Sequence, residues 1–271
     1  MQLQNSLAQT PEQFNTVSGL GGVLGVYPVT AANRWISAMI GVILIGGAGL
    51  AAIYGIYDTT VQVAKYGPVM FSKTIMLPLI IAGVMLFFGL LAAFNAFQNW
   101  NKCLVVYDKG LGYLDNKGIQ IWIWHEITFF FVAITKQYTN GLYTGTTFLY
   151  TLQKEDGSSL RLDNKFKQVE SLGRFIGQKV APYQYDKLRQ QVQNGQIAKL
   201  GPISISLDQL TVKKKSFGWK EVEKVAITNG YVKIQKKGGG RFSGASAPVA
   251  TIPNLEALFA VVNQISRDNV T

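Results

Sequence analysis

The chain has 271 residues, of which 48% are hydrophobic and only 15% are charged, and its formal net charge is +11. So low a charged fraction is unusual for a soluble protein of this length. The single cysteine, Cys103, and the single histidine, His125, cannot form a metal site or a nucleophile–base pair. Because the carboxylates are also few and scattered, we expect no enzyme and no cofactor.

The positive net charge makes nucleic acid a candidate partner to consider. The chain contains no helix-turn-helix pattern, no zinc-ligand spacing and no basic-aromatic stacking platform. We therefore expect no nucleic acid among its partners.

Residues 1–33 are expected to be an N-terminal tail, and residues 34–100 a transmembrane helical hairpin. Two stretches without charge, 35–57 and 75–98, are each long enough to cross the hydrocarbon layer, which takes about 20 apolar residues. Two buried helices of a large soluble core are the alternative. A signal peptide is not expected, because the first apolar run begins at residue 35 and is too long.

The flanks of the hairpin carry residues that suit a membrane interface. Arg34 and Trp35 begin the first helix, and Trp100 and Lys102 follow the second, which predicts four anchors on one membrane face. The charge bias near the helices favours both termini in the cytoplasm, with the protein in the cell (inner) membrane. Cys103, just beyond the membrane, suits a reducing compartment.

Small residues recur at four-residue spacing in both apolar runs, and this spacing allows close helix packing in lipid. The predicted packing residues are Gly47, Ala51, Gly55, Gly89 and Ala93. Neither run contains an ionisable group, so transport by this hairpin alone is not expected.

After the membrane segment, a series of features recurs in the same order. "VVYDKGLGYLD" precedes "WHEITFFFVAI" (124–134), as "ISLDQLTVKK" precedes "WKEVEKVAI" (219–227). "LYTLQKEDG" matches "YVKIQKKGG", and "QVESLGRFIGQKV" matches "NLEALFAVVNQI", with helical spacing in both. We interpret 101–181 and 198–271 as two copies of one domain, joined by a linker helix at 182–197.

This layout, a curled antiparallel sheet closed by one C-terminal helix, resembles the pleckstrin-homology (PH-like) superfold. The whole chain resembles an uncharacterised bacterial family of two-helix membrane proteins with tandem PH-like domains. The resemblance is carried by "LGVYPV", "LGPISIS", "FGWKEVEKVAI", "YVKIQKKG" and "TIPNLEALFAVVNQI". It implies an α+β membrane protein, and it implies no particular activity, because one fold hosts many functions.

The two Trp-x-Glu stretches have two interpretations. Strict alternation along "IQIWIWHEITF" places Trp122, Trp124 and Glu126 on one face of a strand. Each Trp would cover the core while its Glu pairs with a backbone amide or a Lys, or the pair would bind a partner. Retention in both copies favours the structural role.

A basic cluster in the second copy is the candidate contact site for anionic lipid or a partner. Its members are Lys213, Lys214, Lys215, Lys236, Lys237 and Arg241. PH domains that bind phosphorylated lipids use cations around the first strand hairpin, so the resemblance points to this place. A merely solvated basic surface is the alternative.

The sequence thus predicts a non-enzymatic, membrane-anchored recognition or scaffold protein. One alternative is an accessory subunit of a larger membrane complex, whose Gly/Ala helix faces dock against partner helices. Another is a sensor of anionic lipid that uses the basic loops. Membrane lipids and other membrane or cytoplasmic proteins are the expected partners.

Overall fold

The computed structural model describes residue 14 and residues 19–239 and 243–268. The chain divides into two compact units. One consists mainly of Gly25–Val105 and Gly112–Gln120, and the other mainly of Val106–Leu111 and Ile121–Thr271.

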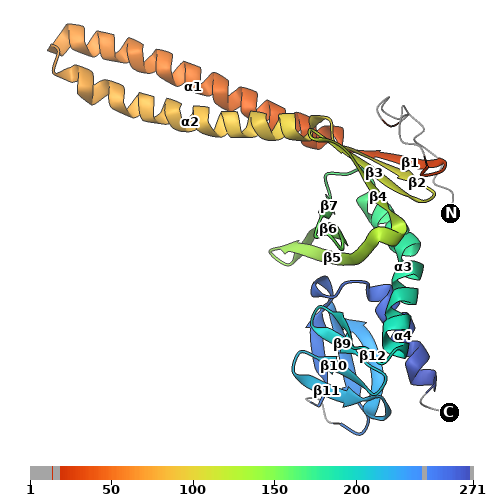
Figure 1. Ribbon diagram of the computed structural model, residues 1–271. Coiled ribbons are helices and arrows are strands. Elements are labelled where there is room, and N and C mark those ends of the chain that lie inside the picture. The colour runs from red at the N-terminus through yellow and green to blue at the C-terminus, as the bar shows by residue number, and fades with distance from the viewer. Residues whose placement is uncertain (1–13, 15–18, 240–242, 269–271) are drawn as a thin grey trace. The chain divides into compact units, whose positions relative to one another are not determined.

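Two long helices dominate the first unit: α1 (Ala31–Tyr66) and α2 (Met70–Trp100). Figure 1 shows them as a pair of extended ribbons joined by a short turn. Both are longer than the predicted 35–57 and 75–98, because charged residues such as Asp58 and Lys73 are compatible with a helix. The chain turns only at Gly67 and Pro68, where Gly67 has φ +90° and donates its N–H to the Val63 carbonyl at 2.9 Å.

The most deeply buried small residues of the two helices recur at seven-residue spacing, whereas the sequence predicted a four-residue series. The buried small residues are Gly41, Ala48 and Gly55 on α1 and Ala82, Gly89 and Ala96 on α2. A Cβ on Gly89 would lie 2.8 Å from Ile45 Cγ1, and one on Gly55 would meet the Pro78 ring. Gly55 and Gly89 therefore lie at the contact between the helices. Gly47 and Ala93 also lie there although they are only partly buried, since a Cβ on Gly47 would meet Met85 and one on Gly41 would lie 3.1 Å from Ala93 N. Ala51 is partly buried as well.

The remaining surface of both helices is apolar and exposed. Only 11% of the most apolar 18-residue stretch of each helix is buried, and each helix is long and apolar enough to cross a membrane. The exposed side chains include Val42, Leu50, Ile53, Leu77 and Phe94. A helix in a soluble core would bury such side chains.

The strands next to the helices form a four-stranded sheet in the order β1-β2-β3-β4. Its members are β1 (Val23–Pro28), β2 (Cys103–Tyr107), β3 (Gly110–Asp115) and β4 (Gly118–Ile123). The prediction of residues 1–33 as a tail is therefore wrong for β1. The hairpin α1–α2 leaves the sheet after β1 and returns to it at β2.

A 3₁₀ turn, η2 (Trp124–Glu126), follows β4, so the predicted continuous strand through Trp124 is wrong. A three-stranded sheet comes next, in the order β5-β6-β7: β5 (Ile127–Thr139), β6 (Leu142–Lys154) and β7 (Ser159–Asp163). Alternation alone cannot distinguish a straight strand from two strands joined by one helical turn.

Helix α3 (Val169–Gln193) packs against this sheet through glycines. A Cβ on Gly173 would collide with the Tyr150 ring, so only glycine permits this approach. The helix is continuous across position 181, where a domain was predicted to end, and occupies most of the predicted linker 182–197. Pro182 lies within it and does not end it, although a proline inside a helix removes one N–H bond and crowds the preceding turn.

Residues 198–268, within the predicted second copy, show the same order of elements as the first sheet domain. A four-stranded sheet, β11-β10-β9-β8, is followed by the 3₁₀ turn η3 (Trp219–Glu221), the sheet β12-β13-β14 and a C-terminal helix. The strands of these two sheets are β8 (Ala198–Leu200), β9 (Ile203–Ile205), β10 (Gln209–Val212), β11 (Lys215–Gly218), β12 (Val222–Thr228), β13 (Tyr231–Lys236) and β14 (Ala245–Pro248).

The short turn η4 (Val249–Thr251) precedes the C-terminal helix α4 (Leu255–Asp268). Apolar residues at helical spacing on α4 complete the core of the second copy. Leu258, Val261 and Val262 are buried in one cluster with Ile203 and Ile234. This is the amphipathic pattern that the sequence predicts for 254–265.

Candidate functional site

Most of the predicted basic residues of the second copy line one groove, with a volume of about 970 Å³. Lys213, Lys214 and Lys215 come from the β10–β11 connection, and Lys236 from the end of β13. Lys237 is not among the lining residues, and Arg241 lies outside the residues that the structure describes. Lys233 lines the groove as well. Its alternation with Ile234 on β13 was the only signal that could have identified it.

Strand pairing fixes the position of the lysines. Val212 pairs with Lys215, so Lys213 and Lys214 form the tip of a two-residue turn. Lys213 has φ +56° and donates its N–H to the Pro202 carbonyl at 2.8 Å. Lys215 Nζ lies 3.2 Å from the Gly244 carbonyl on the opposite wall. The turn therefore places Lys213 and Lys214 at the groove.

Two carboxylates reduce the positive electrostatic potential of the groove. Lys236 Nζ pairs with Glu221 at 2.9 Å, and this hydrogen bond with its charge lowers the pKa of Glu221. Glu223 lines the groove itself. Among the described residues, no ion pair involves Lys213, Lys214 or Lys233. These three cations are available to attract an anionic group.

The two Trp-x-Glu stretches occupy equivalent corners between sheets. Trp124 Nε1 donates to the Asp108 carbonyl at 2.9 Å, and Trp219 Nε1 donates to the Ser206 carbonyl at 3.1 Å. Both indoles are buried. Each strand that follows has an irregular register after its first residue, Ile127 or Val222. The corners therefore serve the core, as the structural interpretation predicted.

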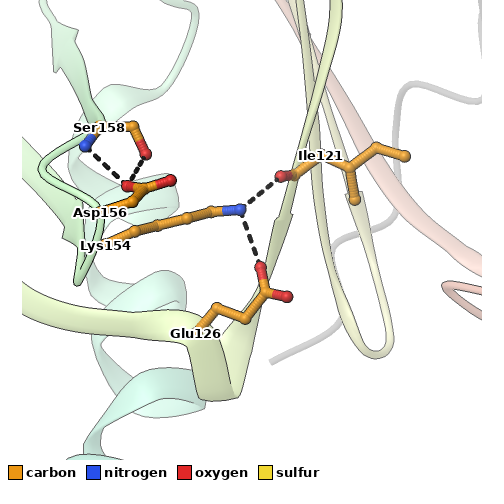
Figure 2. A network of polar contacts seen from close by, with 5 residues as sticks. All are labelled: Ile121, Glu126, Lys154, Asp156 and Ser158. Atoms are coloured by element: carbon orange, nitrogen blue, oxygen red, sulfur yellow. Dashed lines mark hydrogen bonds and ion pairs between the residues drawn. The ribbon is translucent and has the colours of Figure 1, made fainter.

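At each corner the glutamate also forms an ion pair with a lysine from the strand hairpin that follows. Lys154 Nζ lies 2.8 Å from Glu126 and 3.0 Å from the Ile121 carbonyl, as Figure 2 shows. The same lysine lies 5.1 Å from the centre of the Trp122 ring. Glu221 and Lys236 form the equivalent pair. In Figure 2 the Asp156 carboxylate accepts bonds from Ser158, and these bonds lower the pKa of Asp156.

The four predicted interface anchors meet at one end of the helical hairpin. The Trp35 and Trp100 rings are in edge contact, with centroids 5.6 Å apart. Arg34 donates to the Trp100 carbonyl at 3.2 Å and its guanidinium lies 6.0 Å from the ring centre. Lys102 Nζ donates to Asn99 Oδ1 at 2.9 Å. Two aromatic rings and two cations thus lie where both helices end.

No cluster with metal-binding geometry is found among the described residues. Groups of three or more His, Cys, Asp or Glu that could hold a metal ion do not occur there. Cys103 is buried in β2, and its burial raises the pKa of the thiol to about 11. His125 lies in η2, with its ring centre 6.4 Å from that of Tyr183.

Comparison with known proteins identifies a family without naming an activity. No curated protein and no solved structure matches the chain. One family profile matches residues 4–271, which include both apolar helices and every sheet. The chain therefore belongs to a family of unknown function (DUF6585).

Proposed function

We propose that the protein is a two-pass, membrane-anchored recognition or scaffold protein without catalytic activity, with PH-like domains on the cytoplasmic face of the cell (inner) membrane. One observation carries the anchor: α1 and α2 bury small residues against each other and expose large apolar ones outward. This is the reverse of a soluble helix pair, and it suits lipid. The cluster of Arg34, Trp35, Trp100 and Lys102 suits the headgroup layer at one end.

The recognition part of the proposal rests on the two copies. Each consists of a four-stranded sheet, a 3₁₀ corner, a three-stranded sheet and a helix, and we infer that they are duplicated PH-like domains. In each, a left-handed residue precedes the helix: Gln168 with φ +54° and Asn254 with φ +54°. Sheets of this kind can bind a partner at an exposed strand edge.

Cysteine labelling tests the anchor and its orientation. Lys65→Cys, in the last turn of α1, and Lys199→Cys, in β8, are each combined with Cys103→Ala. Each variant then carries a single thiol. In intact cells, an impermeant maleimide should label position 65 and leave position 199 unlabelled until the membrane is opened. Labelling of position 199 in intact cells overturns the orientation. Release of the protein from membranes by alkaline carbonate overturns the anchor.

The basic groove favours a second candidate, a sensor of anionic lipid. Each Lys near an anionic leaflet contributes about 1 kcal/mol of attraction. The full chain, held in nanodiscs of neutral lipid, should co-sediment with anionic vesicles at low salt and lose this association when Lys213, Lys214 and Lys215 become Ala. Substitution of Lys165, Lys167 and Lys179 by Ala is the control of equal charge. The lipid-sensor hypothesis is overturned if both variants lose co-sedimentation equally, or if the unmodified chain does not co-sediment at low salt.

The accessory-subunit alternative needs a different surface from the one that the sequence suggested. Gly55 and Gly89 already pack within the hairpin, so partner helices would have to dock on the outer apolar faces of α1 and α2. Purification from the native cell in mild detergent tests this alternative. A stoichiometric membrane partner would support it, and a chain that purifies alone would oppose it.

A further inference from the structure

Besides the helices between β1 and β2, the two sheet domains differ in the length of one strand hairpin. In the first copy, β5 and β6 pair from Ile127 and Lys154 out to Thr139 and Leu142. The third strand, β7, pairs only with Leu149–Gln153 of β6, and Asn164 bonds to the backbone of Thr146 and Phe148. In the second copy, β14 accompanies β13 as far as Tyr231, the first residue after the turn. Residues 134–148 therefore form a two-stranded arm with no counterpart.

The arm exposes apolar and aromatic side chains near its tip. Tyr138, Leu142 and Tyr143 are 62%, 73% and 59% exposed, and the two tyrosine rings are in edge contact with centroids 5.9 Å apart. They flank the tight turn at Asn140 and Gly141, which both have positive φ. Lys136 is the only charged residue between 134 and 148. Charged side chains are one of the devices that protect exposed strand edges from unwanted pairing, and this arm has a single one.

We propose that the tip of this arm inserts into the headgroup layer of the membrane that α1 and α2 span, as a second membrane contact of the chain. The proposal rests on the proposed anchor, which would keep the arm close to the bilayer. Tyrosine suits the interface because its ring is apolar while its hydroxyl can remain hydrated. The arm has no carboxylate that an anionic leaflet would repel, and Lys136 is attracted to it.

The backbone of the arm limits the depth of insertion. From Thr146 toward the tip, where the bonds to Asn164 end, the outer edges of this two-stranded ribbon have N–H and C=O groups that no third strand pairs. Such groups are not tolerated in the hydrocarbon layer. Only the side chains at the tip can therefore leave water, and the ribbon itself remains at headgroup depth. The competing hypothesis is that a second copy of the chain pairs with the free edge of the arm as a further strand. The register shift between Gln137 and Tyr138 disturbs the edge that such pairing would need.

Spin labels in proteoliposomes test the proposal on the full chain with Cys103→Ala. Leu142→Cys reports on the tip of the arm, and Tyr231→Cys is the matched control, because each residue follows an Asn-Gly turn. Leu50→Cys, exposed on α1, reports on the anchor. We expect collisions with oxygen to exceed collisions with a nickel chelate at positions 142 and 50, and the reverse at position 231.

Each other outcome identifies what has failed. In one such outcome, the label at 142 is as accessible to the nickel chelate as the label at 231 while the label at 50 remains in lipid. This outcome overturns the insertion of the arm and leaves the membrane anchor intact. A label at 50 in water overturns the proposed function itself. Disulfide-linked dimers of the unlabelled Leu142→Cys chain would identify a second copy as the occupant, and would also overturn the proposal.

Discussion

At the scale of single residues, Asn254 connects the segment before α4 to a strand of the first copy. Its N–H donates to the Phe130 carbonyl, its Oδ1 accepts the Phe130 N–H, and its Nδ2 donates to the Thr128 carbonyl, each at 2.8 Å. One side chain thus satisfies backbone groups at the outer edge of β5. The equivalent residue of the first copy, Gln168, has the same φ but is exposed.

This contrast predicts different costs for the same substitution. Asn254→Gly retains the left-handed backbone but leaves the Phe130 N–H and Thr128 carbonyl without partners, and should lower the free energy of unfolding by about 2–4 kcal/mol. Gln168→Gly loses no such bond and removes an unfavourable φ, so it should be neutral or slightly stabilising. Denaturant unfolding of the purified protein measures both. Equal effects would show that the bonds of Asn254 add nothing.

Lys154 and Lys236 offer a second comparison between the copies. Lys154 is four-fifths buried and bonds to both Glu126 and Ile121, whereas Lys236 is more exposed and bonds to Glu221. Lys154→Met should therefore destabilise the protein by about 1–2 kcal/mol. Lys236→Met should have a smaller effect, because water screens its pair. Thermal unfolding followed by tryptophan fluorescence compares the two variants, and a larger loss for Lys236→Met would contradict the assignment.

At the scale of elements, the seven-residue series of small side chains determines how closely α1 and α2 approach. Gly89 lies against Ile45 of the opposite helix, while Gly83 on the same helix has open space where a Cβ would be. Gly89→Leu should overpack the contact and destabilise the helix pair by about 1–3 kcal/mol. Gly83→Leu adds the same side chain toward lipid and should have little effect. Unfolding in increasing SDS distinguishes the two variants, and equal stability would exclude this packing.

The elements that periodicity could predict are those that alternate or repeat without interruption. Both apolar helices and the apolar face of α4 follow from residue patterns, and so does the order in which a Gln-Lys hairpin follows each Trp stretch. Strand β1 was missed because Val23–Pro28 is short and lies among glycines. Lys233 was missed because no basic run marks it. The turn η2 was missed because "WHE" continues the alternation of β4, and only tertiary contact of Trp124 with the Asp108 carbonyl bends the chain there.

At the scale of the whole molecule, the proposed duplication makes the helical hairpin an insertion into the first copy. In the second copy, β8 and β9 are joined by Gly201 and Pro202 alone. In the first copy, the corresponding connection from β1 to β2 contains the whole of α1 and α2. The two ends of the insertion are adjacent, because the Val29 N–H donates to the Lys102 carbonyl at 3.3 Å. A membrane segment can therefore replace a two-residue turn without disturbing the sheet.

This topology predicts that the hairpin can be removed without unfolding the domains. Replacement of residues 30–101 by Asn-Gly, the sequence at the tips of the β5–β6 and β12–β13 hairpins, should join β1 directly to β2. The variant should stay in solution without detergent after ultracentrifugation and unfold in a cooperative transition, because it lacks the apolar surface but retains the sheets. Deletion of residues 19–101, which also removes β1, should aggregate, since it exposes the backbone edge of β2. If both variants aggregate, the sheets depend on the membrane segment for folding, and if both are soluble, β1 is dispensable to the first copy.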